Sequence, residues 1–249
     1  VAFENSFGDK FHTYCLEDWV FTAEFAEDIL LKHFKTNSLK GFGIQEMHLA
    51  IIAAGGALHY LAETEHKQIG HITSISRIEE EKYVWLDKFT IRNLELFYSP
   101  NEGATTLLEV INKTISPMGA RMLKRWMALP LKNVSAIQNR LNVVEYLKDY
   151  SELKENLAVN IKEVGDLERL ISKVSVGRIT PREVVQLKRG LNAIQPIKEA
   201  CINSSNDELR KVGDQLNLCE FIREKIEKEI NEDAPLVVNK GNVIKEGVC

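Results

Sequence analysis

Residues 114–131 read Thr-Ile-Ser-Pro-Met-Gly-Ala-Arg-Met-Leu-Lys-Arg-Trp-Met-Ala-Leu-Pro-Leu, and the rest of the chain is interpreted around this stretch. Ser116 is a favoured N-cap, and Pro117 suits the first helical position because an N–H there would have no helical partner. Pro130 ends the pattern because proline cannot continue the hydrogen-bond ladder. The sequence therefore predicts a helix of about three turns between the two prolines.

The two faces of this expected helix differ in chemistry. At about 3.6 residues per turn, one half is apolar and suited to a core, and the other half is cationic. The apolar half consists of Met118, Met122, Leu123, Trp126 and Met127. The cationic half consists of Arg121, Lys124 and Arg125. Most charged faces are simply solvated, and the alternative is contact with a neighbouring domain or with DNA phosphates.

Length and composition are those of an ordinary folded protein. The chain has 249 residues, 44% hydrophobic and 27% charged, with a formal net charge of −4, which fits one large domain or two modest ones. The charge is unevenly distributed, because residues 113–148 contain seven Lys/Arg and one acid, whereas residues 220–233 are rich in acids. The basic stretch can meet DNA phosphates or an acidic protein surface.

Several classes of site are missing from the sequence. The cysteines are far apart, so neither a zinc site nor a disulfide framework is predicted, and a reducing compartment is the default. No apolar run is long enough for a membrane-spanning helix, and no signal peptide is visible. The phosphate-binding, zinc-protease and serine-hydrolase motifs are absent, so we expect no catalytic residue, metal or cofactor in this chain.

The first 80 residues mix helical and strand-like patterns. Helices are expected over residues 18–35 and 46–64, and short strands over 11–15, 71–78 and 83–86. The second of these helices contains the pair Gly55 and Gly56, each costing about 1 kcal/mol of helix stability relative to alanine. Such a pair is tolerable where another element packs very close to the helix.

From residue 87 to residue 233 the pattern is almost entirely helical. Helices are expected over 105–112, 134–150, 151–164, 166–174, 180–201 and 217–231. Thr180 and Glu183 form a capping box, Asp166 is a further N-cap, and Pro196 predicts an irregularity in the helix that contains it. Residues 236–244 predict a β-hairpin around a glycine turn.

Three strings resemble the MutS family of DNA mismatch-recognition ATPases. They are the 116–131 segment, Thr-Ile-Arg-Asn-Leu-Glu at 90–95, and Asp-Leu-Glu-Arg-Leu at 166–170. The resemblance extends over about residues 11–244. Phe25-Ala26-Glu27 formally matches the family's Phe-x-Glu mismatch motif, but we reject it because Phe25 is in register with an apolar helical face. The family's Walker A motif is absent.

The resemblance implies parts of two domains. Residues 1–80 would be the last part of a connector domain with a ribonuclease-H-like α/β fold. Residues 81–249 would be the first half of the helical core, or lever, domain, ending in the β-hairpin before the family's clamp. The expected fold class is therefore mainly α with a smaller α/β part. Because the chain begins without Met, we also interpret it as a fragment.

The same resemblance implies a function for the parent protein. The parent is expected to bind mismatched DNA, to hydrolyse ATP with Mg²⁺ in a domain outside this chain, to form a homodimer and to meet a MutL-type partner. A bacterial cytoplasmic, nucleoid-associated location is expected, with no membrane contact. The role left for this chain is a linkage that transmits conformational change, and the isolated fragment is expected to be monomeric and without enzymatic activity.

Candidate site residues follow from the same motifs. The candidates for the junction between the domains are Arg92, Asn93, Glu95, Gly119, Arg121, Trp126 and Pro130. The candidates for contact with the DNA backbone or with a neighbouring domain are Lys124, Arg125 and Arg140. Two other interpretations remain open, namely a relative that acts in recombination and an unrelated helical scaffold for protein interactions.

Overall fold

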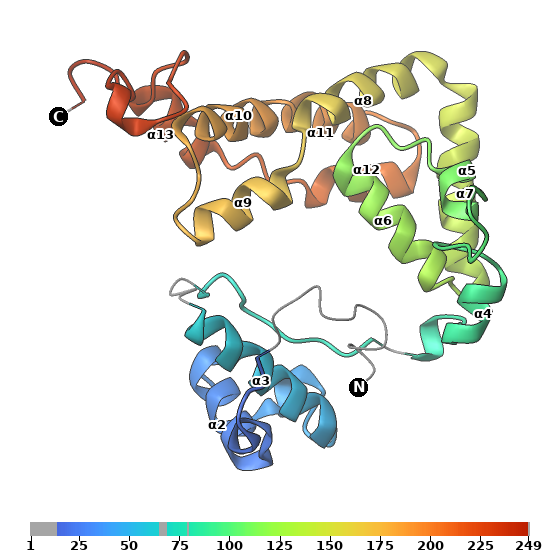
Figure 1. Cartoon of the computed structure of the whole chain (residues 1–249). Coiled ribbons are helices and arrows are strands. Elements are labelled where there is room, and N and C mark those ends of the chain that lie inside the picture. The colour runs from blue at the N-terminus through green and yellow to red at the C-terminus, as the bar shows by residue number, and fades with distance from the viewer. Residues whose placement is uncertain (1–13, 65–68, 79, 249) are drawn as a thin grey trace. The chain divides into compact units, whose positions relative to one another are not determined.

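The computed structural model describes residues 14–64, 69–78 and 80–248. The chain divides into two compact units, Val1–Ile78 and Glu79–Cys249, which run from blue to cyan and from green to red in Figure 1. Regular structure in both units is mainly helical, which confirms the mainly α part of the expected fold class. Each unit is described below by itself.

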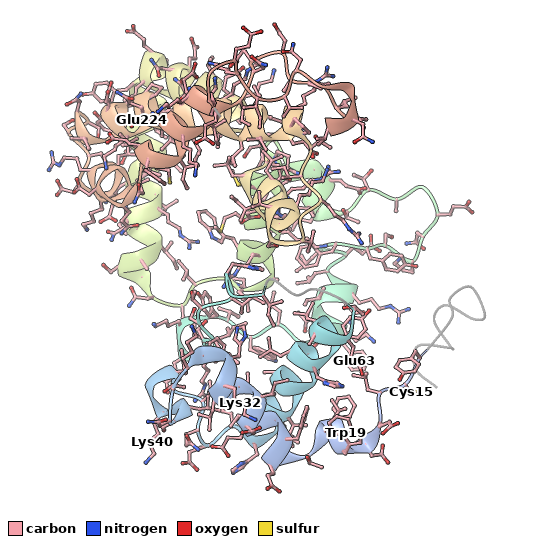
Figure 2. All side chains as sticks on the ribbon, turned by 90° about the vertical axis from the view of Figure 1, so that its left-hand side faces the viewer. Cys15, Trp19, Lys32, Lys40, Glu63 and Glu224 are labelled. Carbon is pink, nitrogen blue, oxygen red and sulfur yellow. The ribbon has the colours of Figure 1, made fainter. Side chains whose placement is uncertain are left out.

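The N-terminal unit is a pair of packed helices with short helical turns around them. It contains η2 (Asp18–Phe21), α2 (Ala23–Phe34), η3 (Leu39–Phe42) and α3 (His48–Glu63). Its core consists of Ala26, Leu30, Leu39, Ile44, Ile51 and Leu58. Trp19 on η2 and Lys40 on η3 lie at the periphery of this unit (Figure 2). The expected helix over 46–64 is confirmed, and the one over 18–35 is interrupted at Thr22, whose backbone is extended.

The glycine pair of α3 marks the closest approach of the two helices. A Cβ atom built on Gly55 would lie 2.5 Å from the Cα of Ala26 on α2. A Cβ on Gly56 would lie 2.9 Å from the ring of Phe21. The prediction that another element packs against this pair is therefore confirmed.

The strands expected over 71–78 and 83–86 are wrong. Residues 72–78 follow no regular element, and no strand is formed among the described residues of the N-terminal unit. This run is held to the rest of the unit by Ile75, which packs against the core, and by a hydrogen bond that His33 Nε2 of α2 donates to the Ile72 carbonyl oxygen at 2.7 Å. Tyr83 makes one isolated antiparallel bridge, to Leu131. An alternating pattern forms a strand only when a neighbour pairs its backbone groups, so the ribonuclease-H-like part of the expected fold is not confirmed. The strand expected over 11–15 lies mostly outside the described residues.

The C-terminal unit is a succession of short and medium helices. In chain order they are η4 (Glu80–Lys82), α4 (Lys88–Asn93), α5 (Leu107–Ile111), α6 (Pro117–Ala128), α7 (Val134–Asp149), α8 (Ser151–Val164), α9 (Leu167–Ser175), α10 (Pro181–Asn192), α11 (Ile194–Ile202), α12 (Asp207–Gln215), α13 (Glu220–Glu229) and η5 (Val238–Lys240). Helices α6, α7, α8 and α9 match the expected ranges closely, whereas α12 was not expected at all. The helix expected over 180–201 is divided at Ala193, three residues before Pro196.

Two apolar clusters hold this unit together. Leu157, Cys201 and Leu209 join α8, α11 and α12. Leu170, Leu187 and Leu191 join α9 and α10, and Ile226 of α13 packs against them. Helix α10 is therefore central to the packing, with α8, α9, α11 and α13 all in contact with it (Figure 1).

The β-hairpin expected over 236–244 is also wrong. Residues 238–240 form the 3-10 helix η5, and Ile244 pairs instead with Ile230 at the end of α13. Asn231 makes this alternative pairing favourable, because its side-chain amide donates to the Asn242 and Ile244 carbonyl oxygens at 3.0 and 3.2 Å. The end of the 236–244 segment therefore pairs with the end of α13 and not with the start of the same segment.

Candidate functional site

Helix α6 begins as its sequence predicts. Ser116 Oγ accepts a hydrogen bond from the Gly119 amide at 3.1 Å, and Pro117 occupies the first turn. A side chain at Gly119 would crowd Ser116 Oγ, which would lie 3.1 Å from its Cβ. Gly119 therefore serves the start of the helix.

The apolar half of α6 does not form a core. No residue of α6 is fully buried, and Trp126 keeps 44% of its surface exposed. Instead of burial, Trp126 has the guanidinium carbon of Arg140, on α7, 3.6 Å from its ring centroid. This cation–π contact brings together two of the candidate residues and joins α6 to α7.

Arg121 joins α6 to the start of α9. Its Nη1 and Nη2 donate to the two Asp166 carboxylate oxygens at 3.1 and 2.7 Å, and its Nε donates to Glu168 Oε2 at 2.8 Å. The fork of the guanidinium matches a carboxylate in a way that lysine cannot. Hydrogen bonding to Asp166 and Glu168 raises the pKa of Arg121, and the same bond from Arg121 lowers the pKa of Asp166.

Asp166 has a second role at the same place. Its Oδ1 also accepts a hydrogen bond from the Arg169 amide at 3.2 Å, which makes it the N-cap of α9. The expected capping role of Asp166 is confirmed, whereas its pairing with Arg121, 45 residues away, was not foreseen.

The end of α6 is fixed to the segment that precedes α4. The Pro130 carbonyl oxygen accepts from the Val84 amide at 2.7 Å, and the Lys132 amide donates to the Lys82 carbonyl oxygen at 3.1 Å. These two bonds flank the isolated bridge between Tyr83 and Leu131. Pro130 therefore ends the helix and also fixes the direction in which the chain continues.

Three candidates, Arg92, Asn93 and Glu95, lie on α4 or just after it. Glu95 has a left-handed backbone, with φ of 47°, and follows the end of α4, where the Leu96 amide donates to the Ile91 carbonyl oxygen at 3.2 Å. Within the described ranges, no hydrogen bond or ion pair joins the side chains of Arg92, Asn93 or Glu95 to α6. Nearby, Lys124 Nζ lies 5.5 Å from the Phe97 ring centroid.

Sequence reasoning missed a series of ion pairs that join α9 to α10 and α10 to α13. Lys173 of α9 binds Glu183 of α10, and Lys188 of α10 binds both Glu227 of α13 and Glu232 just beyond it. Arg189 also binds Glu232, at 2.9 Å. The capping box of Thr180 and Glu183 is confirmed, and it was the only local signal that involved any of these residues.

The Lys173–Glu183 pair leads to a prediction about pH. Hydrogen bonds from Lys173 and from the Thr180 amide lower the pKa of Glu183 to about 2, from an ordinary value of 4.5. A depressed pKa in the folded state stabilises the fold above pH 4.5, and this stabilisation is lost as the pH falls towards 2. We therefore expect Glu183→Gln to reduce the acid sensitivity of urea unfolding between pH 6 and pH 3.

The matched control for this prediction is Glu224→Gln. Glu224 lies on α13 and is labelled in Figure 2, and it forms no ion pair among the residues that the structure describes. If both variants kept the acid sensitivity of the unmodified chain, Glu183 would not be the group that titrates.

Two further kinds of site are absent from the described residues. Among the residues that are described, no group of three or more His, Cys, Asp or Glu side chains is placed to hold a metal ion. No helix in the described ranges has the length and apolar character needed to cross a membrane.

Comparison with known proteins identifies the family. A model of MutS domain III matches residues 89–246, and a model of MutS domain II matches residues 9–73. The chain belongs to the MutS family. All ten candidate residues lie within the MutS domain III match, and the alternative of an unrelated helical scaffold is thereby excluded.

Individual relatives agree with the MutS assignment. The DNA mismatch repair protein MutS of Bacteroides fragilis is 59% identical over 246 residues, which is 99% of this chain and 28% of that protein. The protein of the same name from Bacteroides thetaiotaomicron is 58% identical, covering 100% of this chain and 29% of that protein. The one from Flavobacterium psychrophilum is 54% identical over 99% of this chain. The chain thus spans less than a third of the length of these MutS relatives.

Proposed function

We propose that this chain is the part of a mismatch-repair protein that links its DNA-binding and ATPase parts and transmits conformational change between them. Residues 1–80 would be the end of the connector domain and residues 81–249 the first half of the lever domain. In this proposal, mismatch recognition, ATP hydrolysis with Mg²⁺, homodimer formation and any contact with a MutL-type partner belong to the complete protein in the bacterial cytoplasm. The names of the three quoted relatives favour repair over recombination.

The observation that carries the proposal is the series of ion pairs from helix to helix. Arg121 joins α6 to α9, Lys173 joins α9 to α10, and Lys188 joins α10 to α13. Each pair connects two rigid helices at a defined point. A displacement of one helix is therefore passed to the next, because an ion pair with a fixed geometry is either made or broken.

Arg121 is the first link of this series, and its removal is the direct test. The matching 246 residues of the Bacteroides fragilis protein would be replaced by this chain, with and without Arg121→Ala. We expect the variant to bind mismatched DNA within threefold of the unmodified chimera and to hydrolyse ATP normally without DNA. The change in ATP turnover on adding mismatched DNA is expected to fall at least fivefold.

Arg178→Ala is the matched control, because Arg178 is an exposed arginine that makes no ion pair within the part of the chain that the structure describes. The control is expected to respond to mismatched DNA like the unmodified chimera. A full response from Arg121→Ala would contradict the transmission role. Loss of mismatch binding by that variant would instead indicate a role in DNA binding.

A further inference from the structure

An apolar groove of about 470 Å³ lies between α6, α7 and α12 in the C-terminal unit. Its apolar lining consists of Trp126, Ala136, Val143, Val144, Leu209 and Val212. Only Leu209 among them is fully buried, whereas Val144 is 64% exposed and Val212 is 49% exposed. Water therefore covers apolar side chains here that a protein partner could cover more favourably.

The groove has a preformed anchor point. Trp126 lines it and is held by the Arg140 guanidinium at 3.6 Å from its ring centroid. Tryptophan and arginine contribute most often to the few residues that dominate binding at protein interfaces. Because the contact between them already exists, little side-chain freedom remains to be lost when a partner binds.

The charge around the groove selects the chemistry of the partner. Residues 113–148, which supply both α6 and α7, contain seven Lys/Arg and one acid. The acid of α12 that lines the groove, Glu208, is already neutralised by Lys211 at 2.6 Å. Arg140, which forms no ion pair among the described residues, is therefore the uncompensated charge of the lining and favours a carboxylate beside the apolar contact.

The mixed lining also indicates how long the partner stays. Arg140 and the Glu208–Lys211 pair stand at the groove beside the valines. Permanent interfaces are more apolar than this, whereas reversible ones keep charged groups at their rim. The groove is bordered by helices and its valines are exposed, which suits a helix that inserts a few side chains spaced three and four residues apart.

We propose that this groove is a reversible docking site for an amphipathic helix of another protein, in which carboxylates flank an apolar stripe. The inference rests on the groove and its charge, so it stands independently of the proposed linkage function.

Two designed helical peptides with the same leucine stripe test the proposal. One carries Glu and the other carries Lys on the flanks of the stripe, and both bear a fluorophore for anisotropy titrations with the complete 249-residue chain. We expect the Glu peptide to bind at least tenfold more tightly than the Lys peptide, with affinity falling as salt is raised. Equal binding of the two peptides, or no binding of the Glu peptide, would overturn the proposal.

Matched variants locate the binding. Val144→Asp places a negative charge in the groove, which repels the carboxylates of the Glu peptide. We expect it to weaken binding of that peptide at least tenfold. Val159→Asp, on α8 and outside the groove lining, changes a valine of the same 64% exposure and is expected to alter binding less than twofold. Equal loss in both variants would sink the assignment to this groove. A wild-type chain that dimerises in sedimentation, and a Val144→Asp chain that does not, would show that a second copy occupies the groove instead.

Discussion

Gly55→Ala is expected to destabilise the N-terminal unit by about 2–3 kcal/mol, although alanine is the better helix former by about 1 kcal/mol. The new methyl group would lie 2.5 Å from the Ala26 Cα and 2.6 Å from its Cβ. A backbone atom cannot rotate away as a side chain can. Helices α2 and α3 must therefore separate and loosen the core around Leu30 and Ile51. Pulse proteolysis in urea, with cleavage sites mapped to residues 23–63, measures the loss.

Two further variants make this prediction specific. Gly41→Ala has no atom within 4 Å of its new Cβ and is expected to leave the unfolding midpoint unchanged. Adding Ala26→Gly to Gly55→Ala removes one of the two clashes and is expected to restore part of the stability. A Gly55→Ala chain as stable as the unmodified one would mean that the two helices are not in close contact in solution.

Lys188→Met is expected to destabilise the C-terminal unit by about 2 kcal/mol, because it removes one partner of a buried ion pair. The Lys188 side chain is only 7% exposed, and its ammonium group binds Glu227 and Glu232 together. Burial acts to lower the pKa of Lys188, but the two carboxylates outweigh it and raise the pKa above its ordinary value. Methionine keeps the apolar stem and removes the cation, so Glu227 and Glu232 repel each other and keep only their contacts with Lys245 and Arg189. Urea unfolding followed by circular dichroism measures the change.

Arg189→Met is the control for the Lys188 variant. Arg189 is the next residue, and it binds Glu232 at 2.9 Å with 61% of its side chain exposed. Exposed ion pairs contribute little, so we expect a loss below about 0.5 kcal/mol. Similar losses in the two variants would show that burial of Lys188 does not strengthen its ion pairs.

Local signals in the sequence were sufficient for the starts of α6 and α10. Ser116 and Thr180 cap their helices as expected, because an N-cap acts on an amide only three residues away. The two glycines in α3 also predicted correctly that another element packs close to this helix, because a pair that costs so much helix stability requires a close neighbour. The identity of that neighbour, Ala26, was not readable from spacing.

Contacts between distant residues were beyond the sequence. Lys188 meets Glu227 and Glu232 across 39 and 44 positions, and no periodicity connects them. The sequence placed Arg121 on the cationic face of α6. It could not predict the pairing of Arg121 with Asp166, because no periodicity connects residues so far apart. The strands over 71–78 and 236–244 failed because alternation shows which residues favour a strand, not whether a partner is present.

The double duty of Asp166 has a consequence for the local stability of α9. A nine-residue helix is too short to persist without outside support, and the carboxylate that supports its first turn is the one that Arg121 holds. Fraying of that turn and release of Arg121 from Asp166 are therefore energetically coupled. The amide protons at the start of α9 thus exchange with solvent at a rate that reports whether Arg121 of α6 is bound to Asp166.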